Sequence, residues 1–93
     1  VSNEPGYYLE NEFGIRLENL IYVKFIKKVN GKKLLGFENL TFVPFDTRLM
    51  DISILTNSEK DWMNKYHQEV LEKVGPNLDE SVVVWLKNAV IPI

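Results

Sequence analysis

Hydrophobic and polar residues alternate along one stretch near the start of the chain. The apolar residues take the odd positions, Ile15, Leu17, Ile21, Val23 and Phe25, and the even positions hold Arg16, Glu18, Tyr22 and Lys24. A period of two over about ten residues is typical of a β-strand with one buried face. The pattern therefore predicts a strand here, with Arg16 and Glu18 as neighbours on its polar face.

Turn signals around this stretch predict further strands. Asn30-Gly31 indicates a tight hairpin, because both residues accept a positive φ. We expect a return strand over residues 33–37, a short strand over residues 7–9 followed by a polar loop at 10–12, and another strand over Leu40-Thr41-Phe42-Val43 that ends at Pro44. Residues 46–54 show no clear period and are expected to be irregular.

The second half of the chain has helical patterns. Thr56 and Glu59 fit a capping box, so a helix is expected from there to about Val74, before Gly75 and Pro76. Its predicted apolar stripe consists of Trp62, Tyr66, Val70 and Val74, with Met63 and Leu71 beside it.

Asp79 is a candidate cap for a second helix over about residues 80–88. Its expected buried side is formed by Val82, Val83, Trp85, Leu86 and Ala89, and both tryptophans are expected to anchor the core. Strands followed by helices predict an α+β fold of one small domain.

Composition narrows the function classes. The chain has 93 residues, a net charge of −2 and no cysteine. Disulfides and thiolate metal sites are excluded, and the charge gives no general argument for nucleic-acid or membrane binding. The lysines around the hairpin, Lys24, Lys27, Lys28, Lys32 and Lys33, are best explained as a charged edge that blocks strand addition.

Glu4 and Glu18 are candidate metal ligands. Their carboxylates suit divalent cations, and two adjacent strands could bring them to one point across the thirteen residues between them. Two glutamates alone could not hold two metals. The alternative is that both are solvated surface groups and that Arg16 and Glu18 form a surface ion pair worth under about 1 kcal/mol.

His67 is the only histidine, which argues against a serine–histidine triad or a two-histidine metal site. We expect it to be structural or exposed.

Two motifs, Glu4-Pro5-Gly6-Tyr7-Tyr8 and Gly14-Ile15-Arg16-Leu17-Glu18-Asn19, resemble the last two metal-binding motifs of aminopeptidase P, the Xaa-Pro aminopeptidase branch of the pita-bread metallopeptidases. The similarity continues through Leu40-Thr41-Phe42-Val43-Pro44-Phe45, Leu55-Thr56, Asp61-Trp62-Met63-Asn64-Lys65-Tyr66-His67, Trp85-Leu86 and Ile91-Pro92-Ile93. The resemblance implies that residues 1–45 are antiparallel strands from the end of the pita-bread catalytic domain. Residues 46–93 would then be the helical C-terminal extension of the long, eukaryotic-type cytosolic enzymes.

The resemblance also implies an activity. These enzymes remove the N-terminal residue of peptides that have proline in second position, using two divalent metals, usually manganese, held by two Asp, one His and two Glu. Glu4 corresponds to a ligand that also handles the proton of the attacking water, and Glu18 to the ligand that bridges both metals. Arg16 and Tyr8 correspond to residues that orient ligands by hydrogen bonds. A cytoplasmic homodimer is implied for the complete enzyme.

The resemblance leaves three of the five ligands unaccounted for, because the two Asp and the metal-binding His lie upstream in the family. We therefore expect the chain to be a C-terminal fragment that alone binds metal weakly and has no peptidase activity. Release of the first residue of an Xaa-Pro peptide by the isolated chain would contradict this expectation. Exposed apolar edges are expected to be covered by dimerisation or by the upstream part of the enzyme as another polypeptide.

Two alternatives remain open from the residues. The chain could be a non-catalytic dimerisation module or pseudoenzyme remnant of the same fold, in which case no metal-ligand Asp and His would precede it. It could also hold a carboxylate-based structural metal site, which calorimetric titration with Mn²⁺ would detect.

Overall fold

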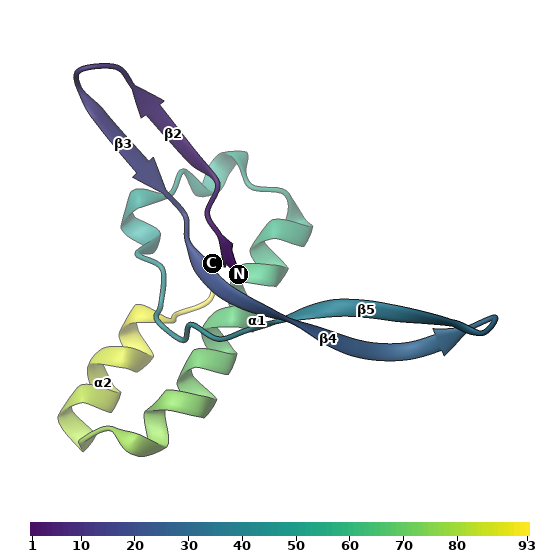
Figure 1. Ribbon diagram of the computed structural model, residues 1–93. Coiled ribbons are helices and arrows are strands. Elements are labelled where there is room, and N and C mark those ends of the chain that lie inside the picture. Colours follow the sequence, from purple (N-terminus) through teal and green to yellow (C-terminus); the bar gives the residue numbers. More distant parts are fainter. The chain divides into compact units, whose positions relative to one another are not determined.

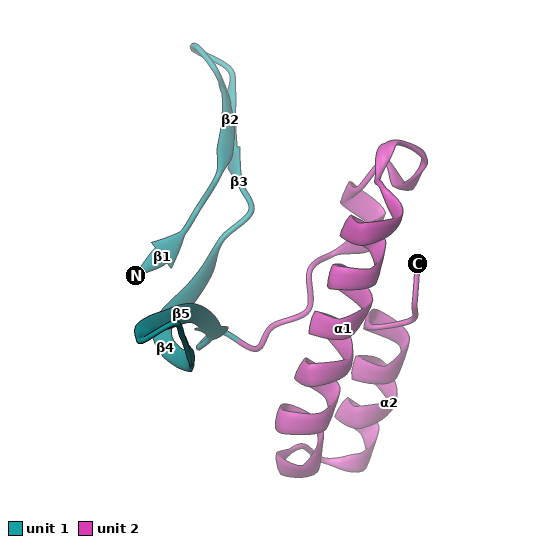
Figure 2. Ribbon diagram, turned by 90° about the vertical axis from the view of Figure 1, so that its right-hand side faces the viewer, with its two compact units in different colours: residues 1–41 teal, residues 42–93 magenta.

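The computed structural model describes residues 1–93 and divides them into two compact units, residues 1–41 and 42–93 (Figure 2). All strands lie in the first unit and all helices in the second. The α+β order predicted from the sequence is confirmed. None of the helices combines the length and the apolar character needed to cross a membrane.

The first unit contains five strands (Figure 1): β1 (Ser2–Asn3), β2 (Gly6–Leu9), β3 (Phe13–Arg16), β4 (Asn19–Val29) and β5 (Lys32–Asn39). They form a three-stranded sheet in the order β1-β4-β5 and a hairpin of β2 with β3, and every neighbouring pair is antiparallel. The single long strand predicted from Ile15 onward is thus divided into β3 and β4.

One register runs through both ladders. Asn3 pairs with Asn19 in the β1–β4 ladder, and Gly6 pairs with Arg16 in the β2–β3 ladder. Gly6 lies three residues after Asn3, and Arg16 lies three residues before Asn19, so both ladders have the same register. Between the ladders, the Leu17 N–H donates to the Pro5 carbonyl at 2.9 Å. Pro5 has no N–H to return a bond, which explains why the pairing is interrupted there. β1–β2 and β3–β4 therefore form one antiparallel ribbon.

The hairpin of β4 and β5 has the predicted turn. Asn30 has φ 50° and Gly31 has φ 76°, the left-handed conformations that an Asn-Gly turn needs. The register shifts between Phe25 and Lys27, so Ile26 is the extra residue of a bulge. This bulge explains why Ile26 breaks the alternation seen in the sequence.

The apolar side of these strands is not covered within the first unit. Asn19 is the only buried residue of the first unit, whereas Val23, Phe25 and Phe37 are 55%, 51% and 65% exposed. Val23 pairs directly with Phe37 across the hairpin. The buried face that the alternation predicts is therefore an open face of the first unit.

The predicted strand over residues 40–43 is wrong, because the segment forms no ladder with a neighbouring strand. The Leu40 N–H donates to the Leu20 carbonyl at 2.8 Å, and the Val43 N–H and carbonyl both bond to the Tyr66 hydroxyl, at 3.2 and 2.8 Å. The backbone groups of these β-favouring residues are satisfied by isolated hydrogen bonds instead of by a ladder with a second strand.

Residues 46–54 form two short 3₁₀ turns, η1 (Thr47–Leu49) and η2 (Ile52–Ile54). Each begins at an aspartate, Asp46 or Asp51, whose carboxylate accepts a bond from the backbone N–H two residues later. Such Asx turns favour short irregular structure over longer helices, in agreement with the expectation for this stretch.

The long helix α1 (Asn57–Val74) begins at the predicted capping box. The Glu59 N–H donates to Thr56 Oγ1 at 3.2 Å, and the Glu59 carboxylate accepts from the Thr56 N–H at 2.7 Å, which lowers the pKa of Glu59. The C-terminus differs from expectation. Gly75 keeps right-handed angles (φ −50°, ψ −45°) and opens a 3₁₀ turn, η3 (Gly75–Asn77), instead of a left-handed cap.

Helix α2 (Glu80–Ala89) packs on α1 through residues spaced four apart. Asp79 is the N-cap, but its side chain makes no capping hydrogen bond. Tyr66, Val70, Leu86 and Val90 form the core cluster, with Phe42, Phe45, Leu71 and Leu78 packed around it. The prediction that the tryptophans anchor this core is wrong, because Trp62 and Trp85 are 49% and 61% exposed.

His67 is part of this core. It is 1% exposed, and its Nε2 accepts a hydrogen bond from the Phe45 N–H at 3.0 Å, so the imidazole proton must be on Nδ1. Nδ1 is itself buried without a partner, and burial lowers the pKa of His67. The histidine is structural, as expected.

Unfolding of the helical unit should depend on pH through His67. Because its pKa is lower in the folded chain, the unfolded state binds more protons, and stability is lost as the pH falls below about 6.5, the ordinary value. The loss cannot exceed about 1.4 kcal/mol per pH unit for one proton. Urea titrations between pH 7 and 5.5 test this by tryptophan fluorescence, since both tryptophans lie in α1 and α2. His67→Gln keeps an acceptor for Phe45 and should remove the dependence, and a wild-type stability that is flat over this range would contradict the expectation.

Candidate functional site

Glu4 and Glu18 occupy corresponding places on the ribbon. Glu4 lies between β1 and β2, and Glu18 lies between β3 and β4. The shared register, continued through the interruption at Pro5, sets Glu4 opposite Glu18 and on the same face as the Gly6–Arg16 pair. Two carboxylates facing each other on a ribbon repel, so this arrangement favours a cation between them.

Arg16 supplies one positive charge beside these carboxylates. Its Nε lies 3.6 Å from Glu18 Oε2, with the two side chains 53% and 44% exposed. The pKa of Arg16 is raised, first by a hydrogen bond and charge interaction with Tyr8 and then by the charges of Glu18 and Glu4. The structure therefore brings together all four residues singled out in the sequence.

Two glycines on the same face belong to this arrangement and were not identified from the sequence. A Cβ on Gly14 would lie 2.7 Å from Tyr8 Cδ1, and a Cβ on Gly6 would lie 2.9 Å from Arg16 Cγ. The available signal was their position inside strand patterns, where an isolated glycine often marks a close approach. Without the register, the sequence did not show what approaches them.

The donor set fits a divalent metal in kind but not in number. Glu4 and Glu18 offer hard carboxylate oxygens, the ligands that Mg²⁺, Mn²⁺ and Ca²⁺ prefer. No group of three or more His, Cys, Asp or Glu side chains is close enough to hold a metal ion. A complete metal centre would need further ligands from outside these 93 residues.

The remaining candidates lie elsewhere in the chain. His67 is buried beside Tyr66 in the helical unit, and Lys24 pairs with Glu38 across the β4–β5 hairpin. The helical unit has a cavity of about 340 Å³ lined by Pro44, Phe45, Asp46, Thr47, Arg48, Trp85, Asn88 and Ala89. Asp46 is the only carboxylate in its lining, and it already accepts two hydrogen bonds from the Arg48 side chain, at 2.9 and 2.7 Å. The cavity therefore offers no unpaired carboxylate for catalysis or metal binding.

Known proteins resemble the chain over its full length. It is 50% identical to the probable Xaa-Pro aminopeptidase P of Coprinopsis cinerea and 50% identical to aminopeptidase P2 of Arabidopsis thaliana, with 100% of this chain covered in both. The chain spans only 16% and 14% of the length of these relatives. Both alignments therefore concern a small part of a much larger protein.

A solved structure agrees in fold. The X-prolyl aminopeptidase of Caenorhabditis elegans, described as a cytosolic enzyme with a di-nuclear active site, superposes with a TM-score of 0.86 and 35% identity. The superposition covers 99% of this chain and 16% of that enzyme. The antiparallel strands followed by two helices thus match the C-terminal part of the pita-bread fold, as expected.

The profile of one protein family matches residues 33–93, which is most of the chain. It is described as the C-terminal region of peptidase M24. The family predicted from the two glutamate motifs is confirmed. The chain belongs to the family formed by the C-terminal regions of M24 peptidases, and its relatives there are aminopeptidases P.

Proposed function

We propose that this chain forms the C-terminal part of a dimetal Xaa-Pro aminopeptidase, which hydrolyses the N-terminal residue from peptides with proline in second position. One observation carries the proposal. Glu4 faces Glu18 on one ribbon, in a chain that is 50% identical along its whole length to an Xaa-Pro aminopeptidase P. A non-catalytic module would give no reason to oppose two carboxylates in this way.

Each residue of the site has a proposed role. The carboxylates of Glu4 and Glu18 would hold the metal ions, and Glu18 would be the ligand common to both. Glu4 is also the catalytic residue whose carboxylate accepts the proton of the attacking water. Arg16 holds the Glu18 carboxylate in place, and Tyr8 holds Arg16.

Two divalent ions would polarise the scissile carbonyl and make the attacking water more acidic. The description of the Caenorhabditis elegans neighbour as having a di-nuclear active site supports two metal ions here. We propose manganese for both because carboxylate ligands suit it. The remaining ligands would come from the upstream part of the enzyme. On this proposal, residues 1–45 end the catalytic domain and residues 46–93 form its C-terminal extension.

The partners and location follow from the same proposal. Open apolar side chains on the strands, including Val23, Phe25 and Phe37, support burial against the upstream part of the enzyme. We also propose that the complete enzyme is a homodimer. A cytoplasmic location is supported by the description of the Caenorhabditis elegans enzyme as cytosolic.

The test is to express the chain joined to the upstream sequence of its own gene and to assay it with Mn²⁺. It should release the first residue from a peptide with proline in second position and not from the matched peptide with alanine there. The upstream sequence should also supply two Asp and one His as further ligands. A folded protein that lacks these ligands, or that leaves the proline peptide intact, would contradict the proposed function.

A further inference from the structure

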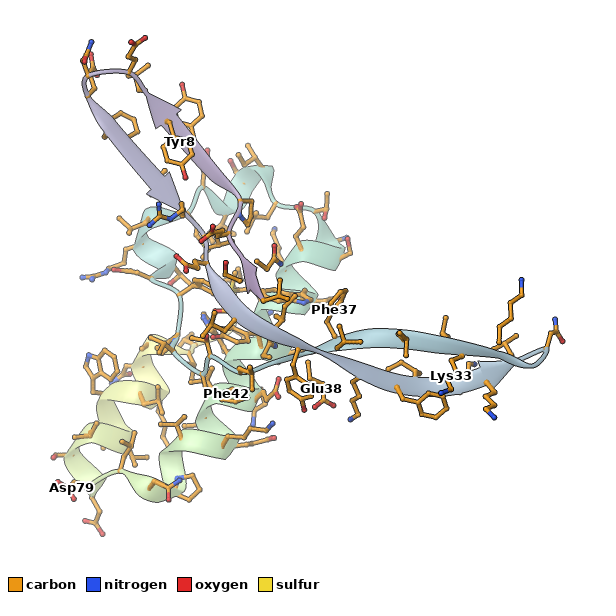
Figure 3. All side chains as sticks on the ribbon, in the orientation of Figure 1. Tyr8, Lys33, Phe37, Glu38, Phe42 and Asp79 are labelled. Atoms are coloured by element: carbon orange, nitrogen blue, oxygen red, sulfur yellow. The ribbon has the colours of Figure 1, made fainter.

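The Tyr8 side chain lies across the β2–β3 hairpin (Figure 3), over a residue that has no side chain. Tyr8 pairs with Gly14 in the register, and a Cβ on Gly14 would lie 2.7 Å from Tyr8 Cδ1 and 3.0 Å from Cε1. The first distance is shorter than real Cβ contacts, and the second is tighter than nearly all of them. The ring therefore occupies the space that any other residue at position 14 would fill.

The same ring leads to Arg16. A Cβ on Gly6, the register partner of Arg16, would lie 2.9 Å from both Tyr8 Oη and Arg16 Cγ. The phenol hydroxyl and the aliphatic part of Arg16 thus meet over Gly6, which sets the hydroxyl beside the Arg16 side chain. Arg16 in turn reaches Glu18 at 3.6 Å. The contacts run from Gly14 through Tyr8 and Arg16 to Glu18.

The two glycines are not needed for the backbone conformation. Gly31 is the only glycine with a positive φ, so Gly6 and Gly14 have angles that alanine also adopts. A Cβ on Gly6 would also lie 2.9 Å from the backbone oxygen of Ile15, whereas a Cβ on Gly14 would meet only the Tyr8 ring. Gly14 is therefore the position at which space alone can be tested.

We infer that Gly14 is a positioning residue of the metal site, because its missing side chain lets Tyr8 lie across the ribbon and hold Arg16 against Glu18. This inference rests on the proposed function. Arg16 is exposed and long, so without the phenol it would sample many rotamers and hold the Glu18 carboxylate less well. The position of the Glu18 carboxylate thus depends on the absence of a side chain at Gly14, four residues earlier in the chain.

The test measures Mn²⁺ binding to the complete protein by calorimetry. Gly14→Ala should push the ring aside and raise the Kd for Mn²⁺ by about tenfold, the lower end of the loss seen when a group supporting a ligand is removed. Gly36→Ala is the matched control. Its Cβ would meet the flexible end of Ile26 at 2.9 Å in the other hairpin, away from Glu18, and the Kd should stay unchanged.

A double-mutant cycle distinguishes an effect of Gly14→Ala on the Tyr8 ring from an effect on the backbone. In a Tyr8→Ala background the ring is gone, so adding Gly14→Ala should weaken Mn²⁺ binding no further. A tenfold loss that persists in this background, or a Gly14→Ala protein with the wild-type Kd, would overturn the inference.

A second variant and the wild-type protein complete the test. If Gly14→Ala does not fold, as judged by circular dichroism, Tyr8→Phe decides, because it keeps the ring over Gly14 and removes only the hydroxyl that lies beside Arg16. An unchanged Kd for Tyr8→Phe would then overturn the inference. A wild-type protein that binds no Mn²⁺ would overturn the proposed function with it, whereas a wild-type protein that binds Mn²⁺ and is insensitive to Gly14→Ala overturns the inference alone.

Discussion

Glu18→Gln in the complete manganese-loaded protein is expected to lower kcat/KM for a proline peptide by more than about 100-fold. That value is the upper end of the loss when a residue only supports a metal ligand, and a ligand shared by two ions should cost more. The amide keeps the size of the side chain but removes the negative charge that attracts the metal cations. Most of the effect should fall on kcat, and metal content measured by atomic absorption should fall below two ions per chain.

Glu12→Gln makes the same chemical change between β2 and β3, at the far end of their hairpin from Glu4 and Glu18. It should leave both kcat/KM and metal content unchanged. If Glu18→Gln retained two bound ions and the wild-type rate, Glu18 would be a surface carboxylate paired with Arg16, and the proposed metal site would be wrong.

Leu86→Ala is expected to destabilise the helical unit by about 2–5 kcal/mol, the range for removing a buried leucine side chain. Leu86 is 2% exposed and lies in the cluster with Tyr66, Val70 and Val90, where α2 packs on α1. The lost methyl groups leave a cavity that these neighbours can fill only in part. Urea denaturation of the 93-residue chain, followed by the fluorescence of Trp62 and Trp85, measures the change.

Leu49→Ala is the control for the same deletion at a position that is 77% exposed, and its cost should be below about 0.5 kcal/mol. Equal costs for the two variants would show that α2 does not depend on Leu86 for its packing on α1.

Local signals predicted the elements well where a few neighbouring residues decide the conformation. The Asn30-Gly31 turn and the capping box of Thr56 with Glu59 depend only on residues within one turn of the chain, and both are confirmed. The strand over residues 40–43 depends on a partner strand, which no local signal could supply. Likewise the size of Trp62 and Trp85 favoured burial, but the crossing of the two helices puts Leu86 and Val90 at the contact instead.

The site was readable in part. The resemblance to aminopeptidase P singled out Glu4, Glu18, Arg16 and Tyr8, and the structure places them on one face of a ribbon. The single register could not be read from the sequence, because Pro5 breaks the ladder between its two halves. The part played by Gly14 became visible only when the register set it beneath the Tyr8 ring.

The most direct test of the metal site is anomalous diffraction at the manganese edge from crystals of the complete protein. We expect two manganese peaks about 3.5–4 Å apart, with an oxygen of Glu4 bound to one ion and the Glu18 carboxylate bound to both. Manganese peaks with neither carboxylate within about 2.6 Å, the outer limit for hard oxygen ligands, would contradict it.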